Sequence, residues 1–398
     1  MAIQDRLAER ITESLNRIWV TTLQSLRSSI LKNQEIRYCP LFLQDVPEDM
    51  PPAEIDSCAT SIGVLLFSKM SPKKHVDENL RGDIKKITET LVLMQNPDGS
   101  WPSIIPLSSS HVVEAEGVVN DTLFALHALL EANTTIYSVP SEVIYDAAKW
   151  LLDNRVQEGW DYVGVKYALE PLASPKVAPT CNSLRLLQRT KQTLAGDSSF
   201  QPIASRIDSA YSVGMEWLGN VSDEGGYGKK YGESATVAHT ALALGALLTD
   251  SDSVAQASNA LRWLLENPRV WELDTLPPAE IFEEYNQILV VREKDRTTPR
   301  RRTITHEHFV EGLLLQSLVE AVRLNLTHEL GWNQRRKFKR LILRSVETIL
   351  GRQEQSGPLT GAFRGRRSAP SQKFPVYALS DAMLALDELL VQYKAVFG

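Results

Sequence analysis

The chain has 398 residues, of which 43% are hydrophobic and 23% charged, so it can bury a large core and is not expected to be disordered. Its formal net charge of -6 gives the whole protein no electrostatic reason to bind nucleic acid. Three scattered cysteines exclude a disulfide framework. No apolar run is long enough to span a membrane, and the charged first residues lack the apolar region of a secretory signal. These features predict a soluble cytoplasmic protein.

The chain begins with apolar side chains at helical spacing over residues 3–31, which predicts an amphipathic helix. A proline-rich loop follows, and residues 54–67 then predict a second helix of small and apolar residues. Five further pairs repeat this plan, with a Gly- and aromatic-rich turn after the first helix, at a period of about 60 residues. Their segments are 85–102 with 118–132, 147–163 with 179–190, 210–228 with 234–248, 257–271 with 308–322, and 344–363 with 377–390.

The two helices of each pair differ in kind. The first keeps one polar face, as an outer helix does, and the second is apolar on most sides, as an inner helix does. The sequence therefore predicts an all-α fold, an α/α toroid of about six helix pairs, in a single domain over residues 1–398. Residues 272–305 are too long for an ordinary connection and predict an exposed, basic loop. An open HEAT-like solenoid is the alternative, although its repeats are shorter and lack the long loops.

The starts of the predicted inner helices would surround one mouth of a central cavity. Helix N-termini favour acids and anions, so polar side chains at this level are candidates for chemistry. Asp121, His239 and Glu311 are the candidate catalytic residues. The same level also holds Thr60, Asn182, and Ser380 or Asp381. Helix capping is the alternative explanation for each of these residues taken singly.

A Gln-Asn-Pro-Asp-Gly-Ser-Trp stretch runs from Gln95 to Trp101. The Gln95 amide can tie loops together, Gly99 permits a tight turn, and Trp101 can stack over a helix end. The stretch resembles the Gln/Trp repeat motif of squalene and terpenoid cyclases, which are related in fold to protein prenyltransferase β subunits. This resemblance implies an apolar cavity that binds an isoprenoid. Weaker copies lie at 158–160, 225–228 and 361–363.

The chemistry implied by these families can be compared residue by residue. Class II terpenoid cyclases carry Asp-x-Asp-Asp-Thr, whereas this chain has Val118-Val119-Asn120-Asp121-Thr122. The position of the proton donor holds Asn120, which is no strong acid, so acid catalysis would fall to Asp121 if burial raised its pKa. Whether the protein is an enzyme therefore stays open.

The prenyltransferase resemblance implies a metal. The zinc site of that family resembles Asp-x-Cys completed by a His one repeat later. Here Asp56 and Cys58 supply the first part, and Asp121 stands where the His would be. Zinc or magnesium is the implied ion. The alternative is that Cys58 is a small buried hydrophobe.

Charge is concentrated in one part of the chain. Residues 292–373 carry eighteen Lys/Arg against eight Asp/Glu, although the whole chain is acidic. Arg300, Arg301 and Arg302 are predicted to bind an acidic protein or nucleic-acid partner. Near the last inner helix, guanidinium forks suited to phosphate oxygens are supplied by Arg364, Arg366 and Arg367. A solvated surface is the alternative.

Three functions remain open from the sequence. The leading one is a cyclase- or prenyltransferase-like toroid that binds an isoprenoid or other apolar ligand, with acid catalysis by Asp121. The second is a non-catalytic toroid that binds a partner through its basic C-terminal face. The most distant is a glycan-active enzyme, in which Asp121 and Glu311 would supply the two carboxylates. Trp160 and Tyr227 are the candidate aromatic residues for contact with the ligand.

Overall fold

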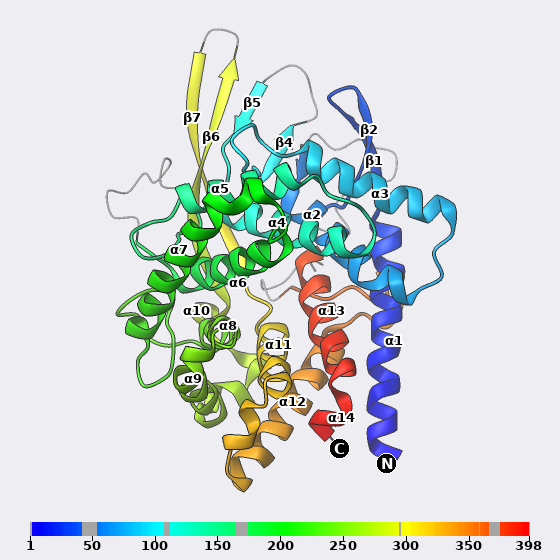
Figure 1. Ribbon diagram of the computed structural model, residues 1–398. Coiled ribbons are helices and arrows are strands. Elements are labelled where there is room, and N and C mark those ends of the chain that lie inside the picture. The colour runs from blue at the N-terminus through cyan, green and yellow to red at the C-terminus, as the bar shows by residue number, and fades with distance from the viewer. Residues whose placement is uncertain are drawn as a thin grey trace.

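The computed structural model describes residues 2–41, 54–106, 112–163, 174–293, 296–357, 359–365 and 375–397, and it is a ring of helix pairs (Figure 1). The inner helices are α2 (Ser57–Met70), α4 (Val119–Thr135), α6 (Val177–Thr193), α8 (Val237–Leu247), α11 (Val310–Arg323) and α13 (Val376–Val391). The outer helices are α1 (Ala2–Ser25), α3 (Glu78–Leu93), α5 (Ser141–Asp153), α7 (Gln201–Val221), α9 (Val254–Glu266) and α12 (Trp332–Arg352). Two short helices are α10 (Pro278–Ile281) and α14 (Tyr393–Phe397).

The inner helices form a closed ring. Each packs on the next in chain order, and α13 packs on both α11 and α2. The predicted all-α toroid of six helix pairs is therefore confirmed, and the open solenoid is excluded.

The inner helices are buried on more sides than the outer helices, as their sequences predict. Every residue of α8 is buried, because this helix has neighbours on all sides. In α5, by contrast, the buried positions are Ile144, Ala147, Ala148, Leu151 and their neighbours on one face. Such a helix needs apolar residues only where it meets the inner ring.

One contact recurs at the loops between outer and inner helices. The backbone N–H of an aromatic loop residue donates a hydrogen bond to a threonine hydroxyl in the first turns of the next inner helix. The pairs are Trp101 with Thr122 at 3.0 Å, Trp160 with Thr180 at 2.9 Å, and Tyr227 with Thr240 at 2.9 Å. This repetition explains why the aromatic residue and the small-residue helix recur together in the sequence.

Gln95, which was predicted to tie loops together, ties its own turn to the first turn of helix α5. Gln95 donates from Nε2 to the carbonyl oxygens of Gly99, at 3.1 Å, and Val143, at 3.0 Å. Gly99 has a φ of 94°, and a β-carbon there would lie 2.3 Å from the carbonyl oxygen of Asp146. No other residue fits this turn without moving backbone.

The last repeat uses the same device to join the ends of the chain. Gln353 donates from Nε2 to the carbonyl oxygens of Gly361, at 3.1 Å, and Ser14, at 3.2 Å. Ser14 belongs to α1, so this side chain ties the final loop to the first outer helix. The ring is thereby fastened where its two ends meet.

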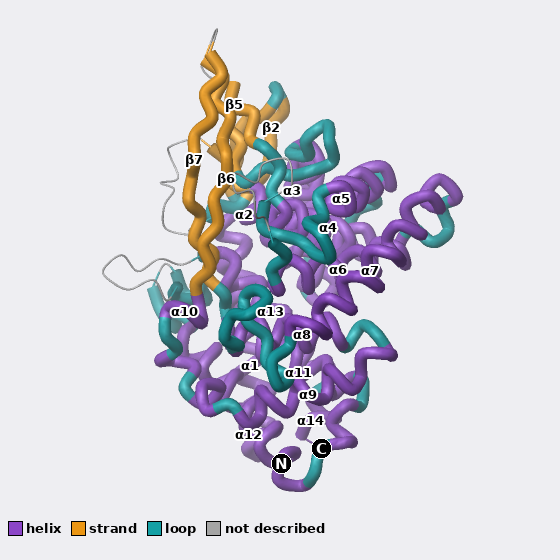
Figure 2. The backbone as a smooth tube through the Cα atoms, turned by 90° about the vertical axis from the view of Figure 1, so that its left-hand side faces the viewer, coloured by secondary structure: helices purple, strands orange, loops and turns teal. Residues whose placement is uncertain are grey.

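The strands gather at the end of the ring where the inner helices begin, and both termini lie at the other end (Figures 1 and 2). Their bounds are β1 (Arg27–Leu31), β2 (Gln34–Tyr38), β3 (Glu54–Asp56), β4 (Ile104–Pro106), β5 (Val112–Ala115), β6 (Phe282–Glu293) and β7 (Arg296–Glu307). All pairings among them are antiparallel: β1 with β2, β3 with β4, β5 with β6, and β6 with β7.

The prediction of a loop over residues 272–305 is wrong. Most of this segment is the hairpin of β6 and β7, which extends from the body in Figure 2. Its many charged residues look like a surface loop in the sequence, but cross-strand pairing and the added strand β5 hold it as a sheet. Pro299 lies on β7, an edge strand of this sheet, where a missing N–H is tolerated.

None of the helices within the described ranges is long and apolar enough to cross a bilayer.

Candidate functional site

A cavity of about 780 Å³ follows the inside of the ring, and all six inner helices line it. This volume suits a small molecule. Its wall is polar at many points, with Asn120, Asn182, Gln188 and Gln316 from three different helices. The predicted apolar cavity is therefore wrong.

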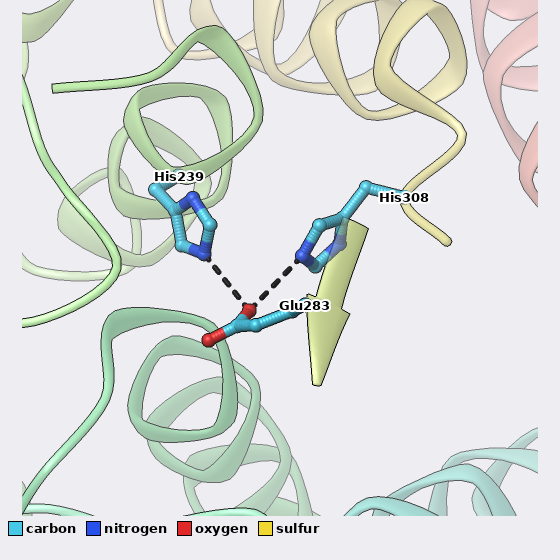
Figure 3. A group of neighbouring side chains, drawn as sticks. All are labelled: His239, Glu283 and His308. Carbon is cyan, nitrogen blue, oxygen red and sulfur yellow. Dashed lines mark hydrogen bonds and ion pairs between the residues drawn. The ribbon is translucent and has the colours of Figure 1, made fainter. Parts of the chain in front are cut away.

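A buried cluster of two histidines and a glutamate lies at the mouth where the inner helices begin. Glu283 on β6 accepts from His239 Nε2 at 3.1 Å and from His308 Nε2 at 3.2 Å, both through Oε2 (Figure 3). His239 is 1% exposed, Glu283 is 3% exposed and His308 is 4% exposed. His308 lines the cavity, so the cluster reaches the ligand space through that imidazole.

Hydrogen bonds fix the tautomers of this cluster. Because carboxylates only accept, both Nε2 atoms carry the proton. His239 Nδ1 forms a hydrogen bond with the Thr236 hydroxyl at 2.7 Å. Tyr162 donates its hydroxyl to the same Glu283 oxygen at 2.5 Å. In the described part of the chain, His308 Nδ1 has no hydrogen-bond partner.

Burial and hydrogen bonding set the protonation states of the cluster. Burial alone would raise the pKa of Glu283, but the hydrogen bonds from His239 and His308 outweigh it and hold that pKa well below its usual range. Burial lowers the pKa of His308. Burial, with the neighbouring His308, also lowers the pKa of His306 to about 3. The cluster thus has an ionised carboxylate, and the neighbouring His306 and His308 favour the neutral form.

Aromatic rings surround the histidines on the cavity side. Tyr162 stacks on Tyr285 with ring centres 4.8 Å apart, and His306 meets His308 edge-on at 4.8 Å. Tyr377 donates its hydroxyl to Glu307 at 3.0 Å. Tyr162, His306 and Tyr377 line the cavity with His308. This half of the mouth is called the histidine half below.

The other half of the mouth is formed by Asp56, Cys58, Asp121 and Asp381, and we call it the acidic half. Asp56 caps α2 by accepting from the Ala59 N–H at 2.7 Å, and Asp121 accepts from the Ser103 hydroxyl at 2.8 Å. Burial and the charge of Asp56 raise the pKa of Asp121 to about 7.

The pKa values of two other groups in the acidic half are raised as well. Burial and the charge of Glu311 raise the pKa of Asp381 to about 7. Burial raises the pKa of the Cys58 thiol well above its usual value. These groups therefore tend to hold their protons at neutral pH.

Two groups of side chains have the donor types of a metal site. Asp56, Cys58 and Asp121 bring ligand atoms within 4.8 Å of one another, as do His239, Glu283 and His308. The first group includes the two residues that the sequence predicts as ligands, and its occupancy stays a prediction. In the second group, the atoms that would meet a metal are already joined by hydrogen bonds.

The three predicted catalytic residues do lie at this end of the ring, but the cavity wall described here includes none of them. Asp121 is buried beside Cys58, and His239 lies behind Glu283. Glu311 is fully buried and forms an ion pair with Arg352.

The predicted ligand-binding residues are placed elsewhere. Trp160 and Tyr227 are buried in loop packing, and Trp160 donates from Nε1 to the Leu151 carbonyl at 2.7 Å. Arg364 forms an ion pair with Glu354 on the exposed surface. Arg366 and Arg367 lie outside the described residues. Arg300, Arg301 and Arg302 lie on β7, and their role with a partner stays a prediction.

Glu283, His306 and His308 are the functional candidates that the sequence did not reveal. Glu283 belongs to the segment 272–305 that was predicted as a loop, and His306 follows that segment directly. One signal was available, because His306 and His308 alternate immediately before an inner helix. In this fold that position faces the mouth.

Comparison with known proteins shows the class of fold. No protein-family model and no curated sequence matches the chain. Among solved structures, the chain is similar to the cellobiose 2-epimerase of Spirochaeta thermophila, at a TM-score of 0.61 and 11% identity over 98% of this chain and 99% of that one. It is also similar to an inactive variant of the alpha-1,6-mannanase of Salegentibacter sp. HEL1_6 in complex with alpha-1,6-mannotriose. That match has a TM-score of 0.59 and 10% identity over 96% and 99% of the two chains.

These similarities correct the predicted family. The relation to terpenoid cyclases and protein prenyltransferases is wrong, and so is the isoprenoid function that followed from it. The chain is also similar to a beta-1,3-1,4-glucanase of Paenibacillus sp. X4, at a TM-score of 0.52, 11% identity, and 95% and 91% coverage, so saccharide enzymes share this architecture over nearly the whole chain. The Gln/Trp motif describes loop geometry that this toroid uses without that chemistry.

Proposed function

We propose that the protein is a carbohydrate-active enzyme that transfers protons on a sugar held in the central cavity. The observation that carries the proposal is His308 on the cavity wall, with its Nε2 proton donated to Glu283 and its Nδ1 free of hydrogen bonds within the described chain. Similarity to saccharide enzymes over nearly the whole chain supports a sugar as the substrate.

The cluster assigns a role to each side chain. Neutral His308 is the base, because its Nδ1 lone pair is available and burial keeps the ring unprotonated. Glu283 is a positioning residue that fixes the tautomer of His308, as carboxylates do for histidines in many sites. His239 and Tyr162 hold that carboxylate in place.

Asp381 supplies the complementary acid. It lines the cavity, and its pKa of about 7 leaves a large share of the carboxyl protonated at neutral pH. In the proposed reaction, His308 removes the proton from the carbon next to the carbonyl of an open-chain sugar, while Asp381 protonates the carbonyl oxygen. Return of the proton from His308 to the former carbonyl carbon gives the isomer, and its return to the opposite face of the original carbon, after the enediol has rotated, gives the epimer. Asp381 regains its proton from the enediol hydroxyl whose oxygen becomes the carbonyl, so both groups return to their starting states.

Glycoside hydrolysis receives less support from the geometry. It ordinarily needs two carboxylates on either side of the bond that breaks. Of the described residues that line the cavity at this mouth, Asp381 alone carries a carboxylate. The other half of the wall presents imidazoles and phenols.

Solvent exchange in deuterated water tests the proposal. The protein is incubated with a panel of reducing mono- and disaccharides, and deuterium at the carbon next to the carbonyl is followed by NMR. We expect exchange with the wild type and a loss of about 100-fold or more in His308→Asn. His127→Asn is the matched control, because His127 lines the cavity away from the cluster. Cleavage of oligosaccharides without exchange, or equal loss in both variants, would contradict the proposal.

A further inference from the structure

A cationic side chain on the cavity wall has no hydrogen-bond or ion-pair partner among the described residues. Arg185 on α6 lines the cavity, and within the described residues its guanidinium makes neither a hydrogen bond nor an ion pair. Its side chain is accessible to solvent, yet the surrounding protein lowers its pKa through burial. The space that it faces is therefore the cavity and not the outer surface.

Two carboxylates near this end of the cavity already have cations of their own, and a third, Asp250, accepts from the Ser253 hydroxyl at 2.7 Å. Glu131 forms ion pairs with Lys69, at 2.8 Å, and with Arg189. Glu320 accepts from Arg323 Nε at 2.9 Å. Of these charges, Glu320 favours the charged form of Arg185, while Arg189 and Arg323 oppose it. Arg185 is thus a cation of the cavity wall that no carboxylate in the described part of the chain contacts in an ion pair.

Helix capping does not account for this residue. Basic side chains near a helix C-terminus offset the helix dipole, but that effect is confined to the last turn. Arg185 is at the middle of α6, which runs from Val177 to Thr193. A guanidinium in such a place, without a partner in the described chain, is available to an anionic ligand in the cavity.

The position of the guanidinium says where that anion would lie. A β-carbon on Gly245 of α8 would be 3.4 Å from Nη1 of Arg185, so the guanidinium lies over that glycine. Gly245 follows His239 by six residues on the same helix, which corresponds to about 9 Å along its axis. The guanidinium is thus deeper in the cavity than the histidine cluster. The distance between them along the helix axis exceeds the length of one sugar ring.

Neighbouring side chains suit the polar remainder of such a ligand. Gln188, Gln192, Tyr211 and Thr249 line the cavity with Arg185. Amides and hydroxyls can pair with sugar hydroxyls, whereas a guanidinium fork matches the two oxygens of a carboxylate or phosphate.

We infer that the cavity binds an acidic saccharide, with Arg185 holding an oxyanion at the end of the ligand away from the reacting carbon. The oxyanion is either the carboxylate of a uronic acid unit or a phosphate ester. Binding of the anion is independent of catalysis, whereas the saccharide part of the inference rests on the proposed function.

Calorimetric titration of the full chain tests the assignment. The probes are inorganic phosphate, glucuronate and glucose 6-phosphate, with glucose as the neutral control. We expect the anions to bind the wild type, and Arg185→Met to weaken them by about tenfold or more while glucose is unaffected. Arg185→Lys should retain part of the affinity, since it keeps the charge without the fork. The ratio of glucuronate to glucose 6-phosphate affinity distinguishes the two sources.

Two controls keep the test decisive. Arg206→Met removes the same charge from the outer surface, where Arg206 pairs with Asp153, and should leave anion binding unchanged. The melting temperature of Arg185→Met without anion should equal or exceed that of the wild type, because an uncompensated charge is removed. Equal anion affinity in the wild type and Arg185→Met, or anion binding no tighter than glucose binding, would overturn the inference.

The failure of this inference is distinguishable from failure of the proposed function. His308→Asn should abolish deuterium exchange and leave anion binding intact, whereas Arg185→Met should weaken anion binding. Anion binding that depends on Arg185, without exchange on any sugar, would sustain the anion site and reject the proton-transfer function.

Discussion

The two halves of the mouth bury carboxyl groups in opposite ways. In the histidine half, Glu283 receives three hydrogen-bond donors on one oxygen and stays ionised. In the acidic half, Asp121 has Asp56 and the Cys58 thiol for neighbours, and its pKa rises to about 7. Both carboxyl groups are almost fully buried, at 3% exposed each. Burial by itself therefore does not decide whether a buried carboxyl group is charged; the donors and charges around it do.

This difference separates two kinds of chemistry within one ring. An ionised carboxylate with imidazole donors fixes a histidine as a base, and a protonated carboxyl group can give up a proton. An enzyme that transfers protons needs both, and the two halves face the same cavity through His308 and Asp381. Substitutions in each half should therefore change stability in opposite directions.

The largest expected effect is in the histidine half. Glu283→Ala leaves three buried donors without their acceptor and should lower the free energy of unfolding by about 3–5 kcal/mol. Glu284→Ala, at the exposed neighbouring position on β6, is the control and should change it by less than about 0.5 kcal/mol. Urea unfolding followed by circular dichroism measures both. A similar small effect for the two variants would mean that the cluster is not the connected unit described here.

The sequence predicted the ring better than it predicted this cluster, for a physical reason. Helix period, Gly99 and the aromatic loop residues are local signals, and they gave six helix pairs with the correct inner and outer roles. The histidine half joins Tyr162, Glu283 and His308, which are 121 and 25 residues apart along the chain. Only the closed ring brings them together.

Asp121 marks the other limit of sequence reasoning. Its place at the start of an inner helix was predicted correctly, but whether it faced the cavity depended on side-chain packing. The family resemblance failed likewise, because a loop motif that stabilises a toroid carries no information on what fills its centre.

In the acidic half, Asp121→Asn should increase stability at high pH. The folded pKa of about 7 exceeds the usual value of 3.8, so the folded protein retains a proton that the unfolded chain releases. Stability from this group is thus complete below about pH 4 and is lost as the pH rises to about 7. The variant should gain about 2–4 kcal/mol over the wild type at pH 8 and nothing at pH 4.

Urea unfolding between pH 4 and 8, with a chelator present, measures this difference. Asp146→Asn on the exposed face of α5 is the control and should track the wild type at every pH. If Asp121→Asn were less stable than the wild type at pH 8, the carboxyl group would be ionised and paired, as Glu283 is.

The smallest expected effect concerns zinc in the acidic half. The Cys58 thiol and Asp121 both hold protons at neutral pH, so a metal at Asp56, Cys58 and Asp121 must displace them. Zinc should therefore raise the melting temperature by only about 1–2 °C, corresponding to about 1 kcal/mol or less, and more at pH 8 than at pH 6.

Cys58→Ser should abolish this zinc response, whereas Cys181→Ser should not, because Cys181 is a buried thiol on α6 outside that group. Differential scanning fluorimetry with and without zinc distinguishes the variants. A response that survives Cys58→Ser but disappears in His308→Asn would place the metal in the histidine half. Glu283 would then be held ionised by a cation, and the contrast between the two halves would depend on metal affinity instead of hydrogen-bond donors.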